Sequence, residues 1–474
     1  MPNQQDPLPP RRAALAIALV LAVSTQAARA EPPIVEHDRS SVKAATVKPR
    51  IASHQAATPD LVPVVAPVVA PVLAPVVAPA AVPPQAAIPA PPPKPADPLA
   101  TPSRMVEHPD KAPVATITLA GRRLVAGGAE GLIILSDDSG ATWRQVQLPV
   151  RTTITGIRFT DDRTGWAIGH SGAVLHTLDS GEHWTLVFDG VRAAQVTLDA
   201  ARSANAADSI RQKKIDAAQR LLSQDTARPF LLIQAGGTGP VRLIGSANLA
   251  VASDDSGKSW RPWSDAIENP DGLQVYGLAQ RNGITLVAGE HGLLLAGKPE
   301  DGLRVLKPPF DGTFFGAIDA GPHGLVIFGQ QGRVYSADLA ANWMPGKPVD
   351  WRRISDPSPT TLTAALLQPD GTLLLGDASG ATWKLQGKPD DDAKLIPYRT
   401  SAPFPILALA EAPDQSLILA GSGGVLRVPS AVVPSPAPPG PVALAPAPAP
   451  APAAPVPAPA APAAADPARP VTPH

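Results

Sequence analysis

The central part of the chain repeats one pattern of apolar and polar positions: a short apolar run, a tight turn containing glycine, and a second short apolar run. Such runs on either side of a glycine turn predict a β-hairpin, because glycine supplies the positive φ that the turn needs. Six copies are clear, at 125–134, 167–175, 286–293, 327–334, 374–381 and 419–426. A weaker seventh copy spans 243–249, where Asn248 replaces the second glycine and tolerates the left-handed conformation.

The spacing of these hairpins predicts the fold class. Their turn glycines stand at positions 128, 169, 245, 289, 329, 376 and 421, so every step but one is roughly 40–47 residues, the period of a four-stranded propeller blade. The long step contains an insertion at 191–224, which lacks glycine and proline and predicts a long helix or a helical hairpin. We therefore predict an all-β fold over residues 102–429: a seven-bladed β-propeller with a helical insertion between blades two and three.

A short run at residues 104–108 precedes the first complete blade. The last blade of a propeller needs an outer strand, and an unpaired edge is a liability for a β-protein. We expect residues 104–108 to supply that strand to blade seven and so to fasten the ring.

The two flanks of this region differ from it in composition. Arg11 and Arg12, the apolar run 13–23 and the small residues around Ala30 are typical of a signal peptide over residues 1–30, cleaved near Ala30. An uncleaved membrane anchor is the alternative. Residues 31–101 and 430–474 hold most of the 60 prolines and predict a disordered Pro/Ala/Val-rich linker and a disordered Pro/Ala-rich tail. We expect a periplasmic or secreted protein.

A second pattern, Ser/Thr-x-Asp-x-Gly-x-x-Trp, follows three of the hairpins. This is the Asp-box, or BNR repeat, in which the aspartate accepts backbone hydrogen bonds within a tight turn and the tryptophan buries its ring near the next blade. We expect these turns to join the third and fourth strands and to be structural, on the face opposite the usual binding mouth. The three copies are Ser136, Asp138, Gly140 and Trp143; Thr177, Asp179, Gly181 and Trp184; and Ser253, Asp255, Gly257 and Trp260.

Two further stretches look like this pattern without matching it. Ser336, Asp338, Ala340 and Trp343 form a degenerate copy. In the stretch 377–383 the aspartate comes one position early and coincides with a hairpin turn. We therefore expect Trp383 to belong to a strand.

The run 165–172, Gly-Trp-Ala-Ile-Gly-His-Ser-Gly, followed by Thr177 to Gly181, resembles the photosystem II stability/assembly-factor propellers, and more closely their relatives in non-photosynthetic bacteria. The insertion after the second blade and the stretches 269–273 and 311–316 resemble that bacterial subgroup too. The resemblance implies a non-catalytic, seven-bladed propeller that helps a membrane protein complex to assemble or work. Bacterial relatives often accompany exporters of the resistance-nodulation-division (RND) type. The degenerate boxes and the long arms depart from the family and leave the partner open.

The amino-acid composition argues against several classes of function. The net charge of −1 gives no reason to expect a nucleic-acid partner. The absence of cysteine excludes disulfides, thiolate catalysis and cysteine-ligated metals. The nine histidines are scattered, with His170 and His291 in equivalent turns of different blades, so no metal and no cofactor are expected.

Two other functions stay open. A sialidase-like glycoside hydrolase needs three arginines, a tyrosine paired with a glutamate, and an acid/base aspartate. Tyr276 with Glu290 is the best candidate pair, and ordinary channel lining is the alternative reading of it. The other function is a module that binds carbohydrate or the cell wall.

The turns between second and third strands share one face with the starts of the channel strands, and propellers usually bind partners there. We expect one of the adjacent Phe314 and Phe315 to enter the core, because neighbours on a strand point to opposite faces. The candidate binding residues are Glu130, Arg151, His170, Tyr276, Glu290, His291, Phe314, Phe315, Gln330 and Gln331.

Overall fold

The computed structural model describes residues 96–430, apart from 225–226, 238, 341–342, 355–359 and 389–390. The chain divides after Val428 into two units, and only the first two residues of the second unit are described. The predicted signal peptide 1–30, the linker 31–101 up to residue 95, and all but one residue of the tail 430–474 lie outside the described residues.

Seven antiparallel sheets follow one another through the described residues, and in six of them four strands are paired in chain order. The first two sheets comprise β1 (Val114–Ala120), β2 (Arg123–Gly128), β3 (Ile133–Ser136) and β4 (Arg144–Val146), then β5 (Ile154–Phe159), β6 (Gly165–Gly169), β7 (Val174–Thr177) and β8 (Thr185–Phe188). The third and fourth comprise β9 (Phe230–Gln234), β10 (Val241–Gly245), β11 (Ala250–Ser253) and β12 (Arg261–Pro262), then β13 (Val275–Arg281), β14 (Ile284–Gly289), β15 (Leu294–Gly297) and β16 (Arg304–Val305).

The remaining three sheets complete the series. The fifth and sixth comprise β17 (Phe314–Asp319), β18 (Leu325–Gly329), β19 (Val334–Ala337) and β20 (Arg352–Ile354), then β21 (Leu362–Leu367), β22 (Leu373–Asp377), β23 (Ala381–Lys388) and β24 (Asp391–Ser401). The seventh has three strands, β25 (Ile406–Glu411), β26 (Leu417–Gly421) and β27 (Gly424–Val428). Trp383 lies in β23, so its assignment to a strand is confirmed.

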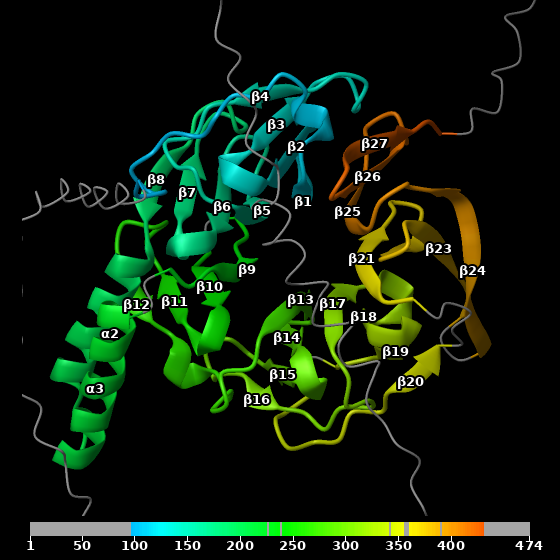
Figure 1. Cartoon of the computed structure of the whole chain (residues 1–474). Coiled ribbons are helices and arrows are strands. Elements are labelled where there is room, and N and C mark those ends of the chain that lie inside the picture. Colours follow the sequence, from blue (N-terminus) through cyan, green and yellow to red (C-terminus); the bar gives the residue numbers. More distant parts are fainter. Residues whose placement is uncertain are drawn as a thin grey trace, which may run out of the picture. The chain divides into compact units, whose positions relative to one another are not determined.

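The first strands of the sheets lie at a common centre. Each first strand contacts the first strand of the next sheet, and β25 of the seventh sheet contacts β1 of the first. Figure 1 shows the sheets following one another around this centre, with the later strands of each sheet farther out. Each sheet therefore presents its first strand to this common centre and its two faces to its neighbours.

Short 3-10 turns join the second and third strands of the first five sheets. Two consecutive residues in each turn have positive φ, such as Glu130 (φ 53°) and Gly131 (φ 76°) in η3 (Ala129–Gly131). In the third sheet the second of these residues is Asn248, with φ 60°, as its sequence context predicts. The corresponding turns are η4 (His170–Gly172), η5 (Ser246–Asn248), η7 (Glu290–Gly292) and η9 (Gln330–Gly332).

A further glycine stands just before each of these turns, and it is required for a different reason from the positive φ inside the turn. Gly128 has an extended backbone, but a Cβ there would lie 2.0 Å from the carbonyl oxygen of Pro113, just before β1. A methyl group cannot approach a carbonyl so closely, so this position requires glycine. Only the sixth sheet departs from this pattern: Asp377 occupies the same register position, opposite Leu362, and its carboxylate accepts hydrogen bonds from the turn.

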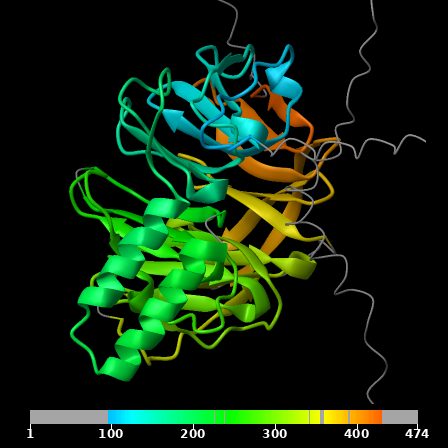
Figure 2. The same ribbon diagram turned by 60° about the vertical axis from the view of Figure 1, so that its left-hand side comes forward.

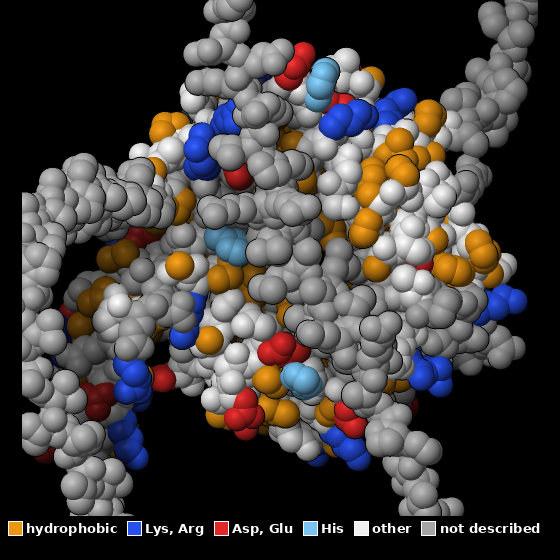
Figure 3. Space-filling model, viewed as in Figure 1, with side chains coloured by type: hydrophobic (Ala, Val, Ile, Leu, Met, Phe, Trp, Pro, Cys, Tyr) orange, Lys and Arg blue, Asp and Glu red, His pale blue; other side chains and the backbone are white. Residues whose placement is uncertain are grey.

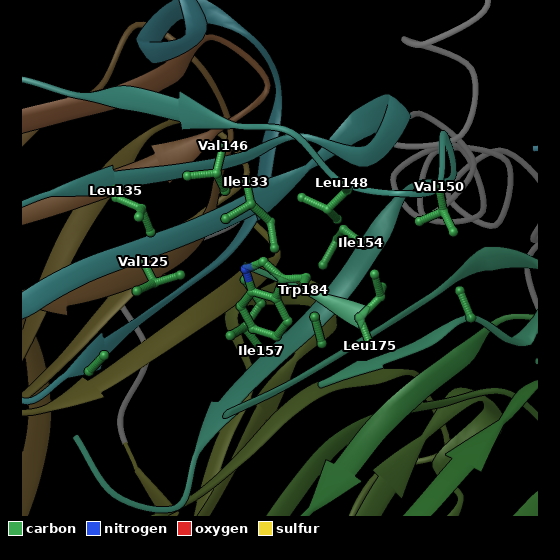
Figure 4. Close-up of a cluster of buried hydrophobic side chains, with 13 residues drawn as sticks. Val125, Ile133, Leu135, Val146, Leu148, Val150, Ile154, Ile157, Leu175 and Trp184 are labelled. Atoms are coloured by element: carbon green, nitrogen blue, oxygen red, sulfur yellow. The ribbon is translucent and has the colours of Figure 1, made fainter. Parts of the chain in front are cut away.

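The hydrophobic core lies between successive sheets. One cluster joins the first two sheets and includes Val125, Ile133, Ile154, Leu175 and Trp184. Figure 4 shows these side chains pointing toward one another from the two sheets. Burial of apolar area at roughly 25 cal/mol per Å² is the main stabilising term at such contacts. Because the other neighbouring pairs of sheets form similar clusters, the core is divided into wedges.

Two helices occupy the span 191–224 between β8 and β9: α2 (Gly190–Ser203) and α3 (Asp208–Gln224). The carboxylate of Asp189 accepts a hydrogen bond from the backbone of Arg192 and caps α2. The two helices lie side by side, with α2 against β12, on the outside of the third sheet (Figure 2). Neither helix is long and apolar enough to cross a membrane.

The prediction for residues 104–108 is wrong. They form no strand and lie beside β4 of the first sheet instead of β27 of the seventh. The backbone N–H of Val106 donates to Oε1 of Gln145 (2.9 Å), and Nε2 of Gln145 donates to the carbonyl of Arg104 (2.9 Å). The amide side chain of Gln145 thus supplies the donor and acceptor that a neighbouring strand would have given this segment.

Three other short helical turns complete the described elements. They are η2 (Pro109–Lys111), η6 (Ser264–Ala266) and η8 (Gly321–His323). η2 contacts β27, and a Cβ on Gly424 would lie 2.0 Å from the carbonyl oxygen of Asp110. The chain just before β1 therefore packs closely against the outer strand of the seventh sheet.

Candidate functional site: a channel mouth opposite the Asp-boxes

Two faces of this arrangement differ in the turns that they carry. The backbone N–H of Ala129, in the first 3-10 turn, donates to the carbonyl of Pro113, just before β1 (3.2 Å). The turns between second and third strands thus lie beside the starts of the first strands, and we call this side the turn face. On the other side, the N–H of Ser180, in the second Asp-box, donates to the carbonyl of Arg163, between β5 and β6 (2.9 Å). We call that side the Asp-box face.

Every sheet carries a β-bulge beside the turn face. In six sheets the register of the first two strands shifts one residue after the first strand begins, and in the third sheet it shifts opposite Gly245. A bulge leaves one residue unpaired and re-aims its side chain. The seven bulged residues are Ala115, Thr155, Leu231, Tyr276, Phe315, Thr363 and Leu407.

Four of the bulged residues surround one cavity. Tyr276, Phe315, Thr363 and Leu407, from the fourth to the seventh sheets, line a cavity of about 290 Å³, which we call the mouth cavity. A second cavity of about 420 Å³ is lined by residues of the first, second, third, fourth and fifth sheets, including Ile157. Most side chains at the mouth cavity are apolar, and those of Tyr276 and Phe315 are aromatic.

The rings of Tyr276 and Phe315 pack against each other across two sheets. Their centroids are 5.2 Å apart with an interplanar angle of 36°. Gly277 makes this possible, because a Cβ there would lie 2.4 Å from the backbone nitrogen of Ala317 and would force β13 and β17 apart. Phe314 is fully buried and Phe315 half-buried, so the expectation that one of the two phenylalanines enters the core is confirmed.

The electrostatics of Tyr276 do not suit a nucleophile. Burial, together with the negative charge of Glu290, raises the pKa of Tyr276 to about 12. The phenol therefore keeps its proton across the physiological range. A tyrosine nucleophile needs the opposite effect, a lowered pKa or an adjacent base that removes the proton.

Glu290 and Gln330 hold the ends of strands. Oε1 of Glu290 accepts the backbone N–H of Gln274, just before β13 (2.8 Å). Oε1 of Gln330 accepts the backbone N–H of Thr313, just before β17 (3.2 Å). Both side chains occupy the first position of their turns and fix the strand starts from which Tyr276 and Phe315 project.

The remaining candidate residues are distributed around the turn face. His170 occupies the first position of its turn, as Glu290 and Gln330 do, and burial lowers the pKa of its imidazole. Glu130, His291 and Gln331 occupy the exposed second position, with positive φ. The predicted residues therefore share one face, but only Tyr276 and Phe315 line the mouth cavity.

Arg151 is exposed in the loop before β5. Its backbone N–H donates to the carbonyl of Pro98 (2.7 Å), and Leu99 packs against the core between the first two sheets. The chain that precedes the first sheet is thus anchored beside Arg151. Figure 3 shows charged side chains of both signs scattered among hydrophobic ones over one side of the molecule.

The Asp-box carboxylates are engaged within their own turns. In the first box, Oγ of Ser136 donates to Oδ1 of Asp138 (2.8 Å) and accepts the N–H of Gly140 (2.8 Å). The hydroxyl of Thr142 donates to Oδ2 of Asp138 (2.6 Å), and its N–H donates to Oδ1 (2.9 Å). These hydrogen bonds, from Thr142 above all, lower the pKa of Asp138 to about 2.

The second and third boxes repeat this network. Thr177 and Ser253 donate to Asp179 and Asp255 (2.8 Å each), and they accept the N–H groups of Gly181 and Gly257. The pKa of Asp255 is likewise lowered to about 2 by Ser259. For Asp179, burial opposes the change, but hydrogen bonds from His183 and Thr177 outweigh it and bring the pKa to about 2. These carboxylates lie in three separate turns and do not converge on one pocket.

The Asp-box tryptophans pack differently from our expectation. Nε1 of Trp143 and of Trp184 donates to the carbonyl of the box glycine, Gly140 or Gly181. We expected these rings to pack toward the next sheet. Instead, Trp143 of the first sheet packs into the core shared with the seventh, and Trp184 of the second sheet into the core shared with the first. Trp260 similarly stacks on Phe188 of the second sheet (4.9 Å). The turn thus directs each indole into the core between its own sheet and the neighbouring sheet on that side.

The degenerate copy differs from the three boxes in sequence, because Ala340 replaces the glycine. Its Asp338 pairs with Arg281 from the fourth sheet (3.2 Å). This aspartate thus joins two sheets through an ion pair.

Sequence reasoning missed two threonines among the bulged residues. Oγ1 of Thr155 donates to the carbonyl of Phe230 in the next sheet (2.6 Å), and Oγ1 of Thr363 donates to that of Ile406. A recognisable signal exists: in three sheets the bulged residue stands between an apolar residue and glycine, as in Ile154-Thr155-Gly156. Within the described ranges, no group of three His, Asp or Glu side chains could hold a metal ion.

The chain matches known proteins over part of its length. Residues 135–198 match the family described as photosynthesis system II assembly factor YCF48. The photosystem II assembly protein Ycf48 of Thermosynechococcus vestitus is 28% identical over 129 residues, which are 25% of this chain and 37% of the relative. The chain thus matches little more than a third of that curated relative.

Two solved structures are also similar to this chain. YCF48 from Cyanidioschyzon merolae has a TM-score of 0.50 at 13% identity, covering 67% of this chain and 96% of that one. A structure of YCF48 bound to a D1 peptide has a TM-score of 0.49 at 14% identity, covering 71% and 99%. Identities this low bear on fold alone, while the sequence match carries the relationship. Together the family match and the Ycf48 relative show that this chain is similar to the photosystem II assembly factor-like propellers.

Proposed function

We propose that this protein is an exported, non-catalytic scaffold that helps a membrane protein complex to assemble, and that it binds a segment of that complex at the mouth cavity. The relationship to a photosystem II assembly protein carries the proposal. The mouth cavity supplies a surface suited to it, because Tyr276, Phe315 and Leu407 offer apolar and aromatic contacts. Large aromatic side chains dominate the energetics of most protein interfaces.

The proposal includes a closed ring of seven blades with the helices inserted between blades two and three. Contact between β25 and β1 supports closure. So does Arg427 of β27, whose Nε donates to the carbonyl of Ser139 in the first sheet (2.9 Å) while its guanidinium also pairs with Asp414 (2.6 Å). A closed ring leaves the bulged residues facing one channel and gives the mouth a fixed shape.

The predicted signal peptide places the scaffold outside the cytoplasmic membrane, in the periplasm or beyond it. A complex of the envelope is then the partner within reach, and an RND-type exporter is the candidate that the bacterial relatives of the family suggest. The Pro/Ala-rich arms suit a protein that must reach such a complex across the periplasm or the cell wall.

A sialidase-like hydrolase is the alternative, with Tyr276 and Glu290 as its reacting pair. The raised pKa of Tyr276 argues against it, and Glu290 Oε1 is engaged by a backbone N–H. In addition, the Asp-box carboxylates lie on the Asp-box face, away from Tyr276, and so cannot serve as the acid/base aspartate of this mechanism. A module that binds carbohydrate or the cell wall remains a third candidate, which the aromatic residues at the mouth would also suit.

The test is to delete the gene and compare the membrane protein complexes of the two strains by quantitative proteomics and native electrophoresis. We expect at least one envelope complex to lose abundance or assembly. Full-length protein should restore it, and a Tyr276→Ala, Phe315→Ala double variant should not. Leu178→Ser provides the matched control, because Leu178 is 63% exposed in an Asp-box turn on the other face.

Two results would overturn the proposal. One is an envelope proteome that does not change on deletion. The other is hydrolysis of sialosides by the purified protein that disappears in Tyr276→Phe, which would establish the alternative. Binding to isolated peptidoglycan or polysaccharide, lost in the double variant, would favour the third candidate.

A further inference from the structure

The two Pro-rich arms are attached to opposite faces of the ring. The described chain begins at residue 96, and Pro98 is held by the backbone of Arg151, three residues before β5 starts on the turn face. The last strand, β27, runs parallel to β25 and so away from the turn face, which brings Val428 to the Asp-box face. The described chain therefore begins on the side of the mouth cavity, whereas Val428 lies on the other side.

The N-terminal arm has a composition that aromatic surfaces recognise. Residues 57–95 consist almost entirely of Pro, Ala and Val, with Asp60 and Lys94 as their charged members. Proline at this density favours polyproline II, which has no internal hydrogen bonds and keeps its carbonyls free. Grooves lined by aromatic side chains bind such segments, because the rings pack against proline and a donor bonds a free carbonyl.

The mouth cavity offers these features. The Tyr276 and Phe315 rings lie side by side at 5.2 Å, half-buried, with Leu407 in the same cavity. The phenol of Tyr276 stays protonated and is a hydrogen-bond donor at neutral pH. Gly277 and the strand-end bonds of Glu290 and Gln330 fix both rings in place, which lowers the entropic cost of binding.

We propose that the Pro-rich segment 57–95 of this same chain binds across Tyr276 and Phe315 and occupies the mouth cavity until a partner displaces it. At about 3.1 Å per residue, a segment of this length extends to roughly 120 Å, far more than is needed to reach the cavity from Pro98. Because the arm is tethered on the same face, its effective concentration at the cavity is high. A low intrinsic affinity is therefore enough to keep the cavity occupied. The displacement by a partner rests on the proposed function, whereas the binding of the arm does not.

The first test uses a photocrosslinking p-benzoylphenylalanine at position 315 of the full chain. After irradiation, mass spectrometry should identify crosslinks to residues 57–95. The same group at position 178, on the Asp-box face, should give none to that segment. A mixture of isotopically labelled and unlabelled chains should show that the crosslinks form within one chain. Crosslinks only to 430–474, only between chains, or none to the arm would overturn the proposal.

A second test measures the arm itself in the full chain. Elastase cleaves after small residues, so it should cut within 57–95 slowly in the wild type and at least several-fold faster in the Tyr276→Ala, Phe315→Ala variant. Tyr276→Phe, which keeps the ring but loses the hydroxyl donor, should be cleaved at a rate between those of the wild type and the double variant. Thermal melts check that each variant is folded. Equal cleavage in the wild type and the double variant would contradict the docking.

The two proposals fail separately. If the arm crosslinks to the mouth but no envelope complex depends on the protein, the docking holds and the proposed function fails. If a complex needs Tyr276 and Phe315 but the arm never reaches them, the mouth binds a partner and the docking proposal is wrong.

Discussion

Single polar side chains hold the Asp-box turns. Thr177 is buried, donates to Asp179 and accepts the backbone N–H of Gly181. Asp179 in turn accepts the N–H of His183 four residues later. One hydroxyl and one carboxylate thus satisfy backbone groups that the tight turn would otherwise leave unpaired beside the core.

We predict that Thr177→Val lowers the free energy of unfolding by about 1–3 kcal/mol, because the N–H of Gly181 loses its acceptor while the shape of the side chain is retained. Thr177→Ser keeps the hydroxyl and should keep most of the stability. Urea denaturation followed by tryptophan fluorescence measures both. An equal loss of unfolding free energy in the two variants would mean that the Thr177 hydroxyl does not stabilise the turn.

The Asp-box carboxylates also predict a dependence on pH. The folded-state pKa of Asp138, Asp179 and Asp255 is about 2, below the value of 3.8 for a free aspartate. A lowered folded-state pKa contributes stability above the unfolded-state pKa, and this contribution is lost as the pH falls toward the folded-state value. The free energy of unfolding should therefore decrease from about pH 4 to about pH 2.

The measurement is a series of denaturation curves between pH 2 and pH 7 for the wild type and for Asp138→Asn. The variant should be less stable at neutral pH, and its stability should fall less steeply below pH 4. An identical acid slope in both proteins would show that the Asp138 turn does not contribute.

The hairpin is the element that repeats most faithfully. Each of the first five hairpins combines a glycine that lies against a carbonyl with a turn containing two positive φ angles. The sixth reaches a similar result with Asp377, whose carboxylate bonds the turn and Nε1 of Trp383 (2.9 Å). The repeated element is thus a backbone geometry that more than one residue can satisfy.

We predict that Gly128→Ala destabilises the protein by about 3 kcal/mol or more, because the new methyl group would meet the carbonyl of Pro113. Gly283→Ala is the control: its φ is +78°, but nothing lies within 4 Å of its Cβ position, so it should cost only about 1–2 kcal/mol. Thermal and urea unfolding compare them. A smaller loss for Gly128→Ala than for Gly283→Ala would contradict the close approach.

Elements with a strong local pattern could be predicted from the sequence. The apolar runs around glycine turns located the hairpins, Asn248 was correctly interpreted as a glycine substitute, and Trp383 as a strand residue. Residues 104–108 could not be placed, because an extended segment can pair with any free backbone and the amide of Gln145 carries no pattern that reveals it. The bulges were also missed, since a one-residue register shift leaves little trace in hydrophobicity.

The positions of the candidate residues could be predicted in part. The sequence placed ten residues on one face, and Tyr276 and Phe315 do line the mouth cavity. It could not show that Glu290 and Gln330 act on strand ends, nor that Gly277 brings the two rings together. These relations depend on contacts between residues on different strands and different sheets, which spacing along the chain does not encode.

At the scale of the molecule, a fixed mouth cavity requires that the sheets close into a ring. Each pair of neighbouring sheets shares a wedge of core, and the seventh sheet is joined to the first by Ile418, Ile134 and their neighbours. The channel, the mouth cavity and the separation of the two faces exist only if that last wedge forms. Binding at the mouth, by a partner or by the arm, depends on it as well.

The most direct test is a distance between the first and last sheets. The chain has no cysteine, so spin labels at Glu130→Cys and Ser422→Cys in the full-length protein are the only ones attached. Both positions lie in turns beside the turn face. Pulsed electron paramagnetic resonance should give a narrow distance distribution close to that of Glu130→Cys with Ser171→Cys, which spans the first and second sheets. A much longer or broad distribution for the first pair, beside a narrow one for the second, would show that the ring is open and contradict the account.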